Sequence, residues 1–306
     1  MEINKALITL KKLKKNEYII FLFHGVVKYN KYQVRNYTKK HITQKNFFNF
    51  LIKCKKIGNP ISINDLHNYT KKKIKLPERS FLVSFDDGFE NNYSCAIPIL
   101  KKLKVPSIFY FSSDFIENNT MSWIDRVEYC FENYNGNLKL PWRKEKCSLN
   151  SNQKKIKYLN EIRKIVKNNK NIDVDLFTQN IFFQTNIKPV KSQKSSIDQK
   201  ISWSKVKKIN KSSLFTIGGH SHQHISLGLI DEKRMKKQIN KSFEMFKKKA
   251  NLKLNHYSYP EGQKIDFNSK VIKTLKKKNI EICPTAINGK NNLKTDLFLL
   301  KRISIN

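Results

Sequence analysis

The sequence predicts an α/β fold: a barrel of about seven parallel strands, with a helical region inserted at about residues 117–200. Apolar runs of strand length alternate with amphipathic helical stretches, which is typical of a parallel sheet. Their even spacing favours closure into a barrel. Polar residues follow several of these runs at the same end, where barrels gather their chemistry. With 306 residues, 39% of them hydrophobic, the chain is expected to form one domain over 1–306.

Each predicted strand is a short apolar run that ends in a turn or in a polar residue. The runs are Glu17–Val27, Phe81–Phe85, Val105–Ser113, Leu214–Gly219, His256–Gly262, Ile280–Ile287 and Leu297–Ile305. Helices are predicted where apolar residues recur every three or four positions. These stretches are Thr43–Ile57, Asn92–Lys104, Met121–Val127, Lys154–Lys167, Trp203 to about Asn210, Asp231–Lys249 and Phe267–Lys278. Thr43 is expected to cap the first of them and Gly58 to end it.

Between Glu117 and Gln199 the strand signal weakens. This region has two helical stretches and two polar loops, Cys147–Gln153 and Lys191–Gln199. It also has few large apolar residues, so we expect an inserted helical region and no separate globular domain.

The net charge is +37, with 61 Lys and Arg against 24 Asp and Glu. Such an excess can indicate an anionic partner. A nucleic-acid site, however, is expected as a clustered basic patch, whereas these lysines occur in every segment. Nucleic acid is therefore disfavoured, and an anionic or lipid-phosphate-linked substrate remains open.

The five cysteines are scattered and lack the Cys-x-x-Cys spacing, which fits a reducing cytoplasm and argues against a cysteine zinc site. The first residues lack an apolar stretch of signal-peptide length, and no run of apolar residues is long enough to span a bilayer. We expect a cytoplasmic protein.

Asp86 and Asp87 follow the apolar run Phe81–Phe85 and precede Gly88. Two like charges at the end of a core strand repel each other, and partial burial increases the cost. A bound cation, or a different role for each carboxylate, would relieve that repulsion. The alternative is a solvated Asp-Gly turn.

His220 and His224 lie four residues apart where a strand meets a turn. If that turn is helical, both rings lie on one side and can bind one metal ion, and His222 points elsewhere. Asp87 would be the third ligand and water the fourth, which is the catalytic zinc pattern. Asp86 would then be free to act as a base. The alternative is a polar surface loop, and the same ligands also suit cobalt, nickel or iron.

Two motifs resemble those of the polysaccharide deacetylases, the NodB-homology or carbohydrate esterase family 4 group. Ser84–Gly88 is similar to Thr-Phe-Asp-Asp-Gly, and His220–His224 is similar to His-Ser/Thr-x-x-His. Ile201–Trp203 and Tyr259–Gly262 add weaker matches, and the resemblance runs from about Ile19 to the C-terminus. It implies a distorted (β/α)7-type barrel and a metal-dependent enzyme that removes N- or O-acetyl groups from carbohydrates.

The resemblance also implies roles for the motif residues. Asp86 would be the general base, and Asp87, His220 and His224 the metal ligands. The backbone N–H of Glu261, after the proline of the third motif, would stabilise the oxyanion.

Two positions depart from the family pattern. Ser258 stands where the family carries an arginine that holds the base, and Arg302 on the last strand is the expected substitute. The late Leu-x-His motif, source of the general acid, is absent. Some members place that histidine on the first strand, so His24 is the expected general acid, with His256 as second choice.

The expected activity is hydrolysis of a carbon–nitrogen bond other than a peptide bond, with a divalent metal, Zn²⁺ favoured. The expected substrate is an N-acetylated carbohydrate, with nucleotide-linked and lipid-phosphate-linked sugars as candidate forms. Peripheral contact with the anionic inner face of a membrane is a further expectation. The alternatives are an impaired carbohydrate-binding member of the same fold and an amidase acting on a non-sugar substrate.

Overall fold

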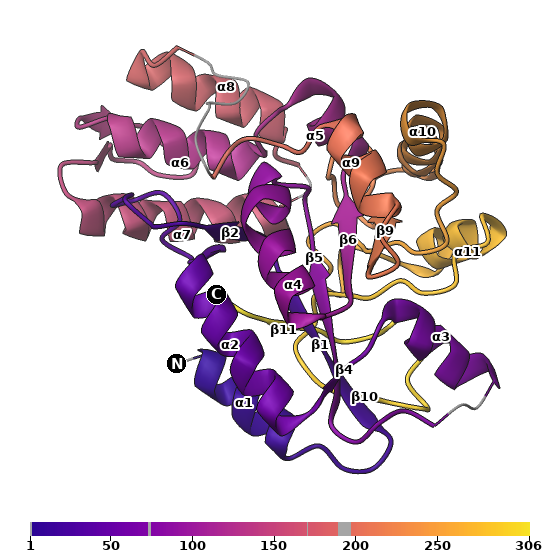
Figure 1. Cartoon of the computed structure of the whole chain (residues 1–306). Coiled ribbons are helices and arrows are strands. Elements are labelled where there is room, and N and C mark those ends of the chain that lie inside the picture. The colour runs from indigo at the N-terminus through magenta and orange to yellow at the C-terminus, as the bar shows by residue number, and fades with distance from the viewer. Residues whose placement is uncertain (1, 73–74, 170, 189–196) are drawn as a thin grey trace.

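The computed structural model describes residues 2–72, 75–169, 171–188 and 197–306, and its centre is a mostly parallel sheet (Figure 1). The strands of this sheet are β1 (Glu17–Phe23), β4 (Asn59–Pro60), β5 (Ser80–Phe85), β6 (Ser107–Phe111), β9 (Phe215–Gly219), β10 (Asn291–Asn292) and β11 (Ile303–Ser304). β1, β5, β6 and β9 are parallel neighbours in that order. Short pairs are formed by β2 (Gly25–Val27) with β3 (His41–Thr43), and by β7 (Asn137–Leu138) with β8 (Cys147–Ser148). The α/β class with a parallel sheet is confirmed.

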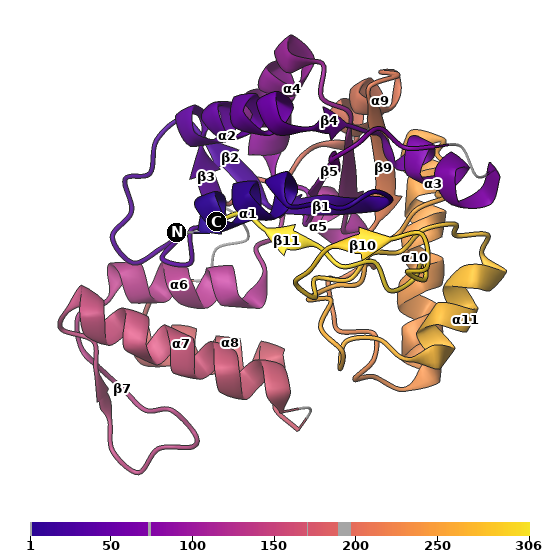
Figure 2. The same ribbon diagram turned by 90° about the horizontal axis from the view of Figure 1, so that it is seen from below.

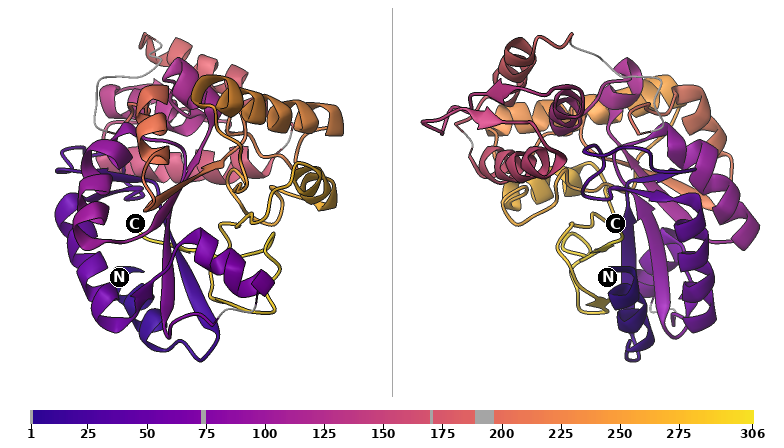
Figure 3. Two further views of the ribbon diagram at one scale, coloured as in Figure 1. Left: turned by 45° about the vertical axis from the view of Figure 1, so that its right-hand side comes forward. Right: turned by 90° about the vertical axis from the view of Figure 1, so that its left-hand side faces the viewer.

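Within the described ranges, the regular strands do not close into a barrel. Beyond β9, the strand arrangement continues only through isolated bridges, in which Gly219 pairs with Tyr257 and His256 pairs with Ile282. The C-terminal segment then returns to β1, because β11 pairs with β1 in parallel. Figure 3 shows this C-terminal segment, drawn in yellow, running beside β1.

Three predicted strands are therefore wrong in part. His256–Gly262 and Ile280–Ile287 form only isolated bridges, and in Leu297–Ile305 only β11 is regular. Prolines at 260 and 284 interrupt the first two runs, and a proline cannot donate to a strand ladder.

In the part of the chain that the structure describes, the predicted helices are all present and four more accompany them, as Figure 1 labels them. The helices are α1 (Glu2–Lys11), α2 (Gln44–Ile57), α3 (Ile63–Lys72), α4 (Ile97–Leu103), α5 (Ser113–Asn118), α6 (Trp123–Asn133), α7 (Asn152–Asn168), α8 (Val174–Thr185), α9 (Trp203–Asn210), α10 (Glu232–Ala250) and α11 (Ser269–Lys277), with a π-helical turn over Asn92–Ala96 before α4. The side chain of Thr43 accepts from the Asn46 N–H and caps α2, which Gly58 follows as the C-cap. α1, α3, α5 and α8 were not predicted. Within the described residues, no helix combines the length and the apolar character needed to cross a membrane.

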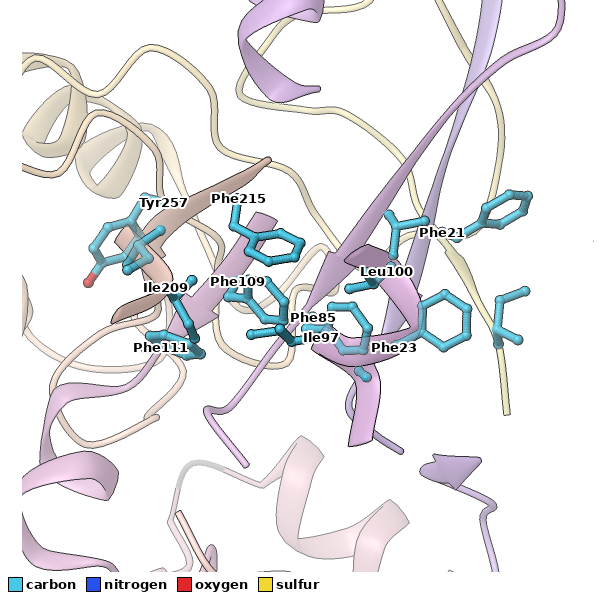
Figure 4. Packing of buried hydrophobic residues seen from close by; sticks show 14 of the residues in the cluster. Phe21, Phe23, Phe85, Ile97, Leu100, Phe109, Phe111, Ile209, Phe215 and Tyr257 are labelled. Carbon is cyan, nitrogen blue, oxygen red and sulfur yellow. The ribbon is translucent and has the colours of Figure 1, made fainter. Parts of the chain in front are cut away.

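Aromatic residues from neighbouring strands fill the main core. The rings of Phe23, Phe85 and Phe109 stack in sequence, with centroids 5.5 Å and 4.9 Å apart, and Figure 4 shows them between Phe21 and Phe215. Stacked, fully buried rings contribute large apolar area and fix the spacing of β1, β5 and β6. The carboxyl-terminal ends of these parallel strands are thereby held side by side at the same edge of the sheet.

The inserted region has a hydrophobic core of its own. Fifteen buried residues, Val34 and fourteen between Ile124 and Phe182, form a separate cluster, so the region packs more large apolar side chains than the sequence analysis expected. Figure 2 shows α6, α7 and α8 grouped on one side of the molecule and α10 and α11 on the other. A buried ion pair, Arg35 with Asp198, joins the loop before β3 to the end of the insertion. Most of the predicted loop Lys191–Gln199 lies outside the described residues.

Substituting Phe109 with alanine should lower the free energy of unfolding by about 3–5 kcal/mol, because it leaves a cavity between stacked rings. Urea denaturation followed by circular dichroism measures this change. Phe183→Ala is the matched control: its side chain is 85% exposed, so its effect should stay within about 0.5 kcal/mol. Equal effects of the two substitutions would contradict the assigned core.

Candidate active site

The two adjacent carboxylates lie directly after β5, in a sharp turn. The backbone N–H of Asp86 donates to the carbonyl of Phe23 at 3.0 Å. Asp87 and Gly88 both have positive φ, 74° and 88°. A side chain at Gly88 would also meet the ring of Phe111 at 3.2 Å, so this position requires glycine. The turn leaves both carboxylates buried at the C-terminal end of the strands.

Arg302 holds Asp86 through two parallel hydrogen bonds. Nη1 donates to Oδ1 at 2.8 Å and Nη2 donates to Oδ2 at 2.7 Å, while Nε donates to the Thr285 carbonyl at 2.6 Å. Burial alone would raise the pKa of Asp86, but its electrostatic interactions with Arg302 and, to a smaller extent, with His220 are stronger in total and lower the pKa. Asp86 is therefore ionised at neutral pH. Arg302 contacts Asp86 as expected of a substitute for the missing motif arginine.

Asp87 faces two imidazoles with one of its oxygens. Oδ1 lies 3.0 Å from His224 Nε2 and 3.6 Å from His220 Nε2. Apart from these two rings, the same buried oxygen has no hydrogen-bond partner among the described residues. Burial alone would raise the pKa of Asp87, but Lys40 and then His224 outweigh it and hold the pKa well below its ordinary value.

Ser258 fixes the orientation of His220. His220 Nδ1 lies 3.0 Å from the carbonyl oxygen of Ser258 and 2.7 Å from its hydroxyl. Because a carbonyl oxygen only accepts, Nδ1 carries the proton in the first of these bonds. Nε2 is then left with its lone pair facing Asp87, as second-shell partners commonly arrange a ligand histidine.

His220 and His224 come together without a helix between them. Ser221 and His224 both have positive φ, 59° and 54°, and the segment is a bend. The two rings lie 4.8 Å apart, and Phe115 stacks on the His224 ring at 5.5 Å. The four-residue spacing had suggested a helical turn here, and that suggestion is wrong. Two residues in the left-handed conformation reverse the chain instead. His222 points away from this group, with Nδ1 2.8 Å from the Ser113 hydroxyl.

The two candidate general acids lie in different places. His24 follows β1, and Asp86 and Asp87 lie near enough for their charges to act on its pKa, which burial lowers to about 4. Its Nδ1 is buried without a hydrogen-bond partner among the described residues. Burial also lowers the pKa of His256 to about 4, and the charged group that acts on it among the described residues is His67 of α3. His24 is therefore the candidate that lies within electrostatic reach of Asp86 and Asp87.

Glu261 lies in a turn that the inserted region contacts. Its φ is 60°, and its backbone N–H donates to no acceptor among the described residues. Its carboxylate forms an ion pair with Lys167 of α7. Burial would raise the pKa of Glu261, but Lys167 and then His224 outweigh it and lower the pKa to about 2.

Asp87, His220 and His224 are suited to a metal ion. Their ligand atoms lie within 4.8 Å of one another. A buried carboxylate oxygen that faces two imidazole nitrogens is a donor set for Zn²⁺ or a neighbouring transition metal. The residues present therefore fit the cation that the motifs imply.

A wide cleft opens beside these residues. Its volume is about 1640 Å³, and its walls include His224, Glu261 and Phe115 from the barrel side and Arg163, Lys167 and Phe183 from the inserted region. A reactant much larger than one acetyl group can enter it.

Sequence reasoning missed Lys40 and Lys167, which contact Asp87 and Glu261. No signal singled them out, because the chain has 61 basic residues. Ser258 was noted only as a missing arginine, although it is the partner of His220.

The model of the polysaccharide deacetylase family matches residues 73–283 of the chain. A poly-β-1,6-N-acetyl-D-glucosamine N-deacetylase of Staphylococcus aureus (strain MSSA476) is 27% identical over 126 residues, which cover 38% of this chain and 43% of that protein. The match thus spans less than half the length of that relative.

Solved structures resemble the whole chain. The Streptococcus pyogenes deacetylase PplD in complex with acetate aligns with a TM-score of 0.61 and 13% identity, over 95% of this chain and 93% of that one. IcaB from Ammonifex degensii aligns with a TM-score of 0.60 and 16% identity, over 96% and 93%. At these identities the likeness shows a shared fold.

Replacing Arg302 with methionine should lower the free energy of unfolding by about 3–5 kcal/mol at pH 7, because it leaves Asp86 buried and unpaired. The double variant with Asp86→Asn should lose less, since neither charge remains. The pKa of Asp86 is lower in the folded protein than its unfolded value of about 3.9. The contribution of the pair is therefore complete above that value and is lost as pH falls through the folded pKa.

Urea denaturation of both single variants and the double variant, at pH 7 and at pH 3, measures this coupling. Additive losses at pH 7 would show that the two side chains do not interact.

Proposed function

Because the chain belongs to the polysaccharide deacetylase family, we propose that it is a metal-dependent hydrolase that removes N-acetyl groups from a carbohydrate. One observation carries the proposal: Oδ1 of Asp87 faces His220 and His224 and no other described hydrogen-bond donor, next to an ionised carboxylate that Arg302 holds. This arrangement supplies a cation site and a base side by side.

Asp87, His220 and His224 would hold the cation, with Zn²⁺ favoured by the ligand types. When bound, such a cation acidifies water and polarises a carbonyl oxygen. The three side chains come from two strand ends, and Ser258 holds His220 in the tautomer that leaves Nε2 free.

Asp86 is proposed to take the proton of the attacking water. Its lowered pKa keeps it ionised over the whole neutral range, although a lower pKa also makes it a weaker base. Arg302 fixes both oxygens of Asp86, so the carboxylate has one orientation. The backbone N–H of Glu261 is the proposed donor to the developing oxyanion, and its lack of a described acceptor supports that role.

His24 is proposed to protonate the leaving amine. With a pKa of about 4 it is neutral near pH 7, so it must first gain a proton inside the complex. We propose that it receives the proton that Asp86 removes from water. In the complete reaction a C–O bond forms, the C–N bond breaks, and that proton ends on the amine.

The substrate is proposed to be an N-acetylated carbohydrate, as named for the Staphylococcus aureus relative. A cleft of about 1640 Å³ supports an oligosaccharide or a sugar with a large attached group. Nucleotide-linked and lipid-phosphate-linked sugars, and a cytoplasmic location at an anionic membrane face, remain proposals. The charge of +37 and five unpaired cysteines support them.

Replacing Asp86 with asparagine should reduce acetate release by about 10²–10⁴-fold, because the base is lost. Zn²⁺ affinity should fall by no more than about 10–100-fold, since the three ligands remain. The full-length protein, loaded with Zn²⁺, is assayed on a β-1,6-linked N-acetylglucosamine oligosaccharide, and isothermal titration calorimetry measures binding. His224→Ala should lose Zn²⁺ binding, and a chelator should abolish acetate release reversibly.

His222→Ala is the matched control from the same bend and should leave both quantities within about twofold. Full activity of Asp86→Asn would refute its role as base. Oligosaccharide binding without acetate release at any metal loading would favour the impaired, carbohydrate-binding alternative.

A further inference from the structure

Lys40 places an ammonium group between two carboxylates beside the proposed metal site. Its Nζ lies 3.3 Å from Asp87 Oδ2 and 3.3 Å from each oxygen of Asp125. The ring of Phe89 lies under the same ammonium at 4.7 Å. Only 15% of the Lys40 side chain is exposed, so water screens these charges weakly.

The contact divides the two oxygens of Asp87 between different partners. Oδ1 faces His220 and His224, whereas Oδ2 faces Lys40. With Oδ2 occupied, Asp87 is available to a cation through one oxygen. Part of its negative charge is already balanced before a cation arrives.

We propose that Lys40 tunes the metal site: it weakens the binding of a divalent cation and thereby leaves a bound cation more electrophilic. Asp125 opposes this effect, because it shares the ammonium with Asp87. The inference rests on the proposed function, in which Asp87, His220 and His224 hold the cation.

Asp125 connects this charge balance to the inserted region. It lies in the first turn of α6, where its N–H donates to the side chain of the N-cap residue Ser122 at 3.2 Å. The side chain of Asp125 is 8% exposed. An element outside the sheet thus supplies the carboxylate that limits how strongly Lys40 acts on Asp87.

Among the described residues, Arg302 and Lys200 also lie near this site, and no ion pair joins either of them to Asp87. Arg302 is fully engaged with Asp86 and Thr285. Lys200 lies over the Phe89 ring at 3.4 Å, and its Nζ has no hydrogen-bond partner among the described residues. Lys40 is therefore the cation whose removal changes the charge at Asp87 most directly.

The test is a pair of substitutions with opposite expected signs, measured by Zn²⁺ calorimetry on the full-length protein. Lys40→Met keeps the length of the side chain and removes its charge, so Zn²⁺ affinity should rise by about tenfold or more. Asp125→Asn leaves Lys40 acting on Asp87 alone, so affinity should fall by about tenfold. Lys237→Met removes an exposed charge from α10 and should change affinity by less than about twofold.

Absorption of the Co²⁺-loaded protein gives a readout independent of activity. Lys40→Met frees Oδ2 to join the cation, so the visible bands of Co²⁺ should weaken as its coordination number rises. Circular dichroism confirms that each variant is folded, and Asp125→Asn tests the proposal by itself if Lys40→Met does not fold.

Weaker Zn²⁺ binding in Lys40→Met, or unchanged or tighter binding in Asp125→Asn, would overturn the inference and leave the proposed function intact. A wild-type protein that binds no divalent cation would overturn both.

Discussion

The structure depends on keeping two adjacent carboxylates ionised in a buried turn. Asp86 and Asp87 are each 4% exposed, and unpaired charges at that depth would be neutralised by protonation. Each carboxylate instead has its own cation, Arg302 for Asp86 and Lys40 for Asp87. The irregular C-terminal segment has to return to β1 to deliver Arg302, and the loop before β3 has to deliver Lys40.

This pairing changes what the adjacent aspartates imply. Repulsion between two carboxylates is no evidence for a bound metal when the chain itself supplies two cations. The metal proposal depends on a narrower feature, the single oxygen of Asp87 whose only polar neighbours among the described residues are the imidazoles of His220 and His224. The two aspartates differ because Arg302 occupies both oxygens of Asp86, whereas Lys40 occupies one oxygen of Asp87.

Sequence patterns predicted the parts of the fold that rest on local periodicity. β1, β5, β6 and β9 are of this kind, as are α2, α4, α6, α7 and α9 and the two motifs at the strand ends. What they could not predict depends on contacts between distant segments. Lys40 looks like every other lysine until the chain folds, and the insertion's core assembles from scattered residues. The bend at His220–His224 needs left-handed residues that are not glycine, and spacing alone gives no sign of them.

Charged residues of the inserted region form ion pairs with charged residues of the site. Asp125 from α6 shares Lys40 with Asp87, and Lys167 from α7 pairs with Glu261. Arg35 is buried against Asp198 at the far end of the same region. Without the insertion, Glu261 and Arg35 would lose these partners and Lys40 would keep only Asp87. For Arg35, whose side chain is 4% exposed, the loss would cost about 3–5 kcal/mol. A change in how the insertion packs therefore changes the charge balance at Asp87 as well as the shape of the cleft.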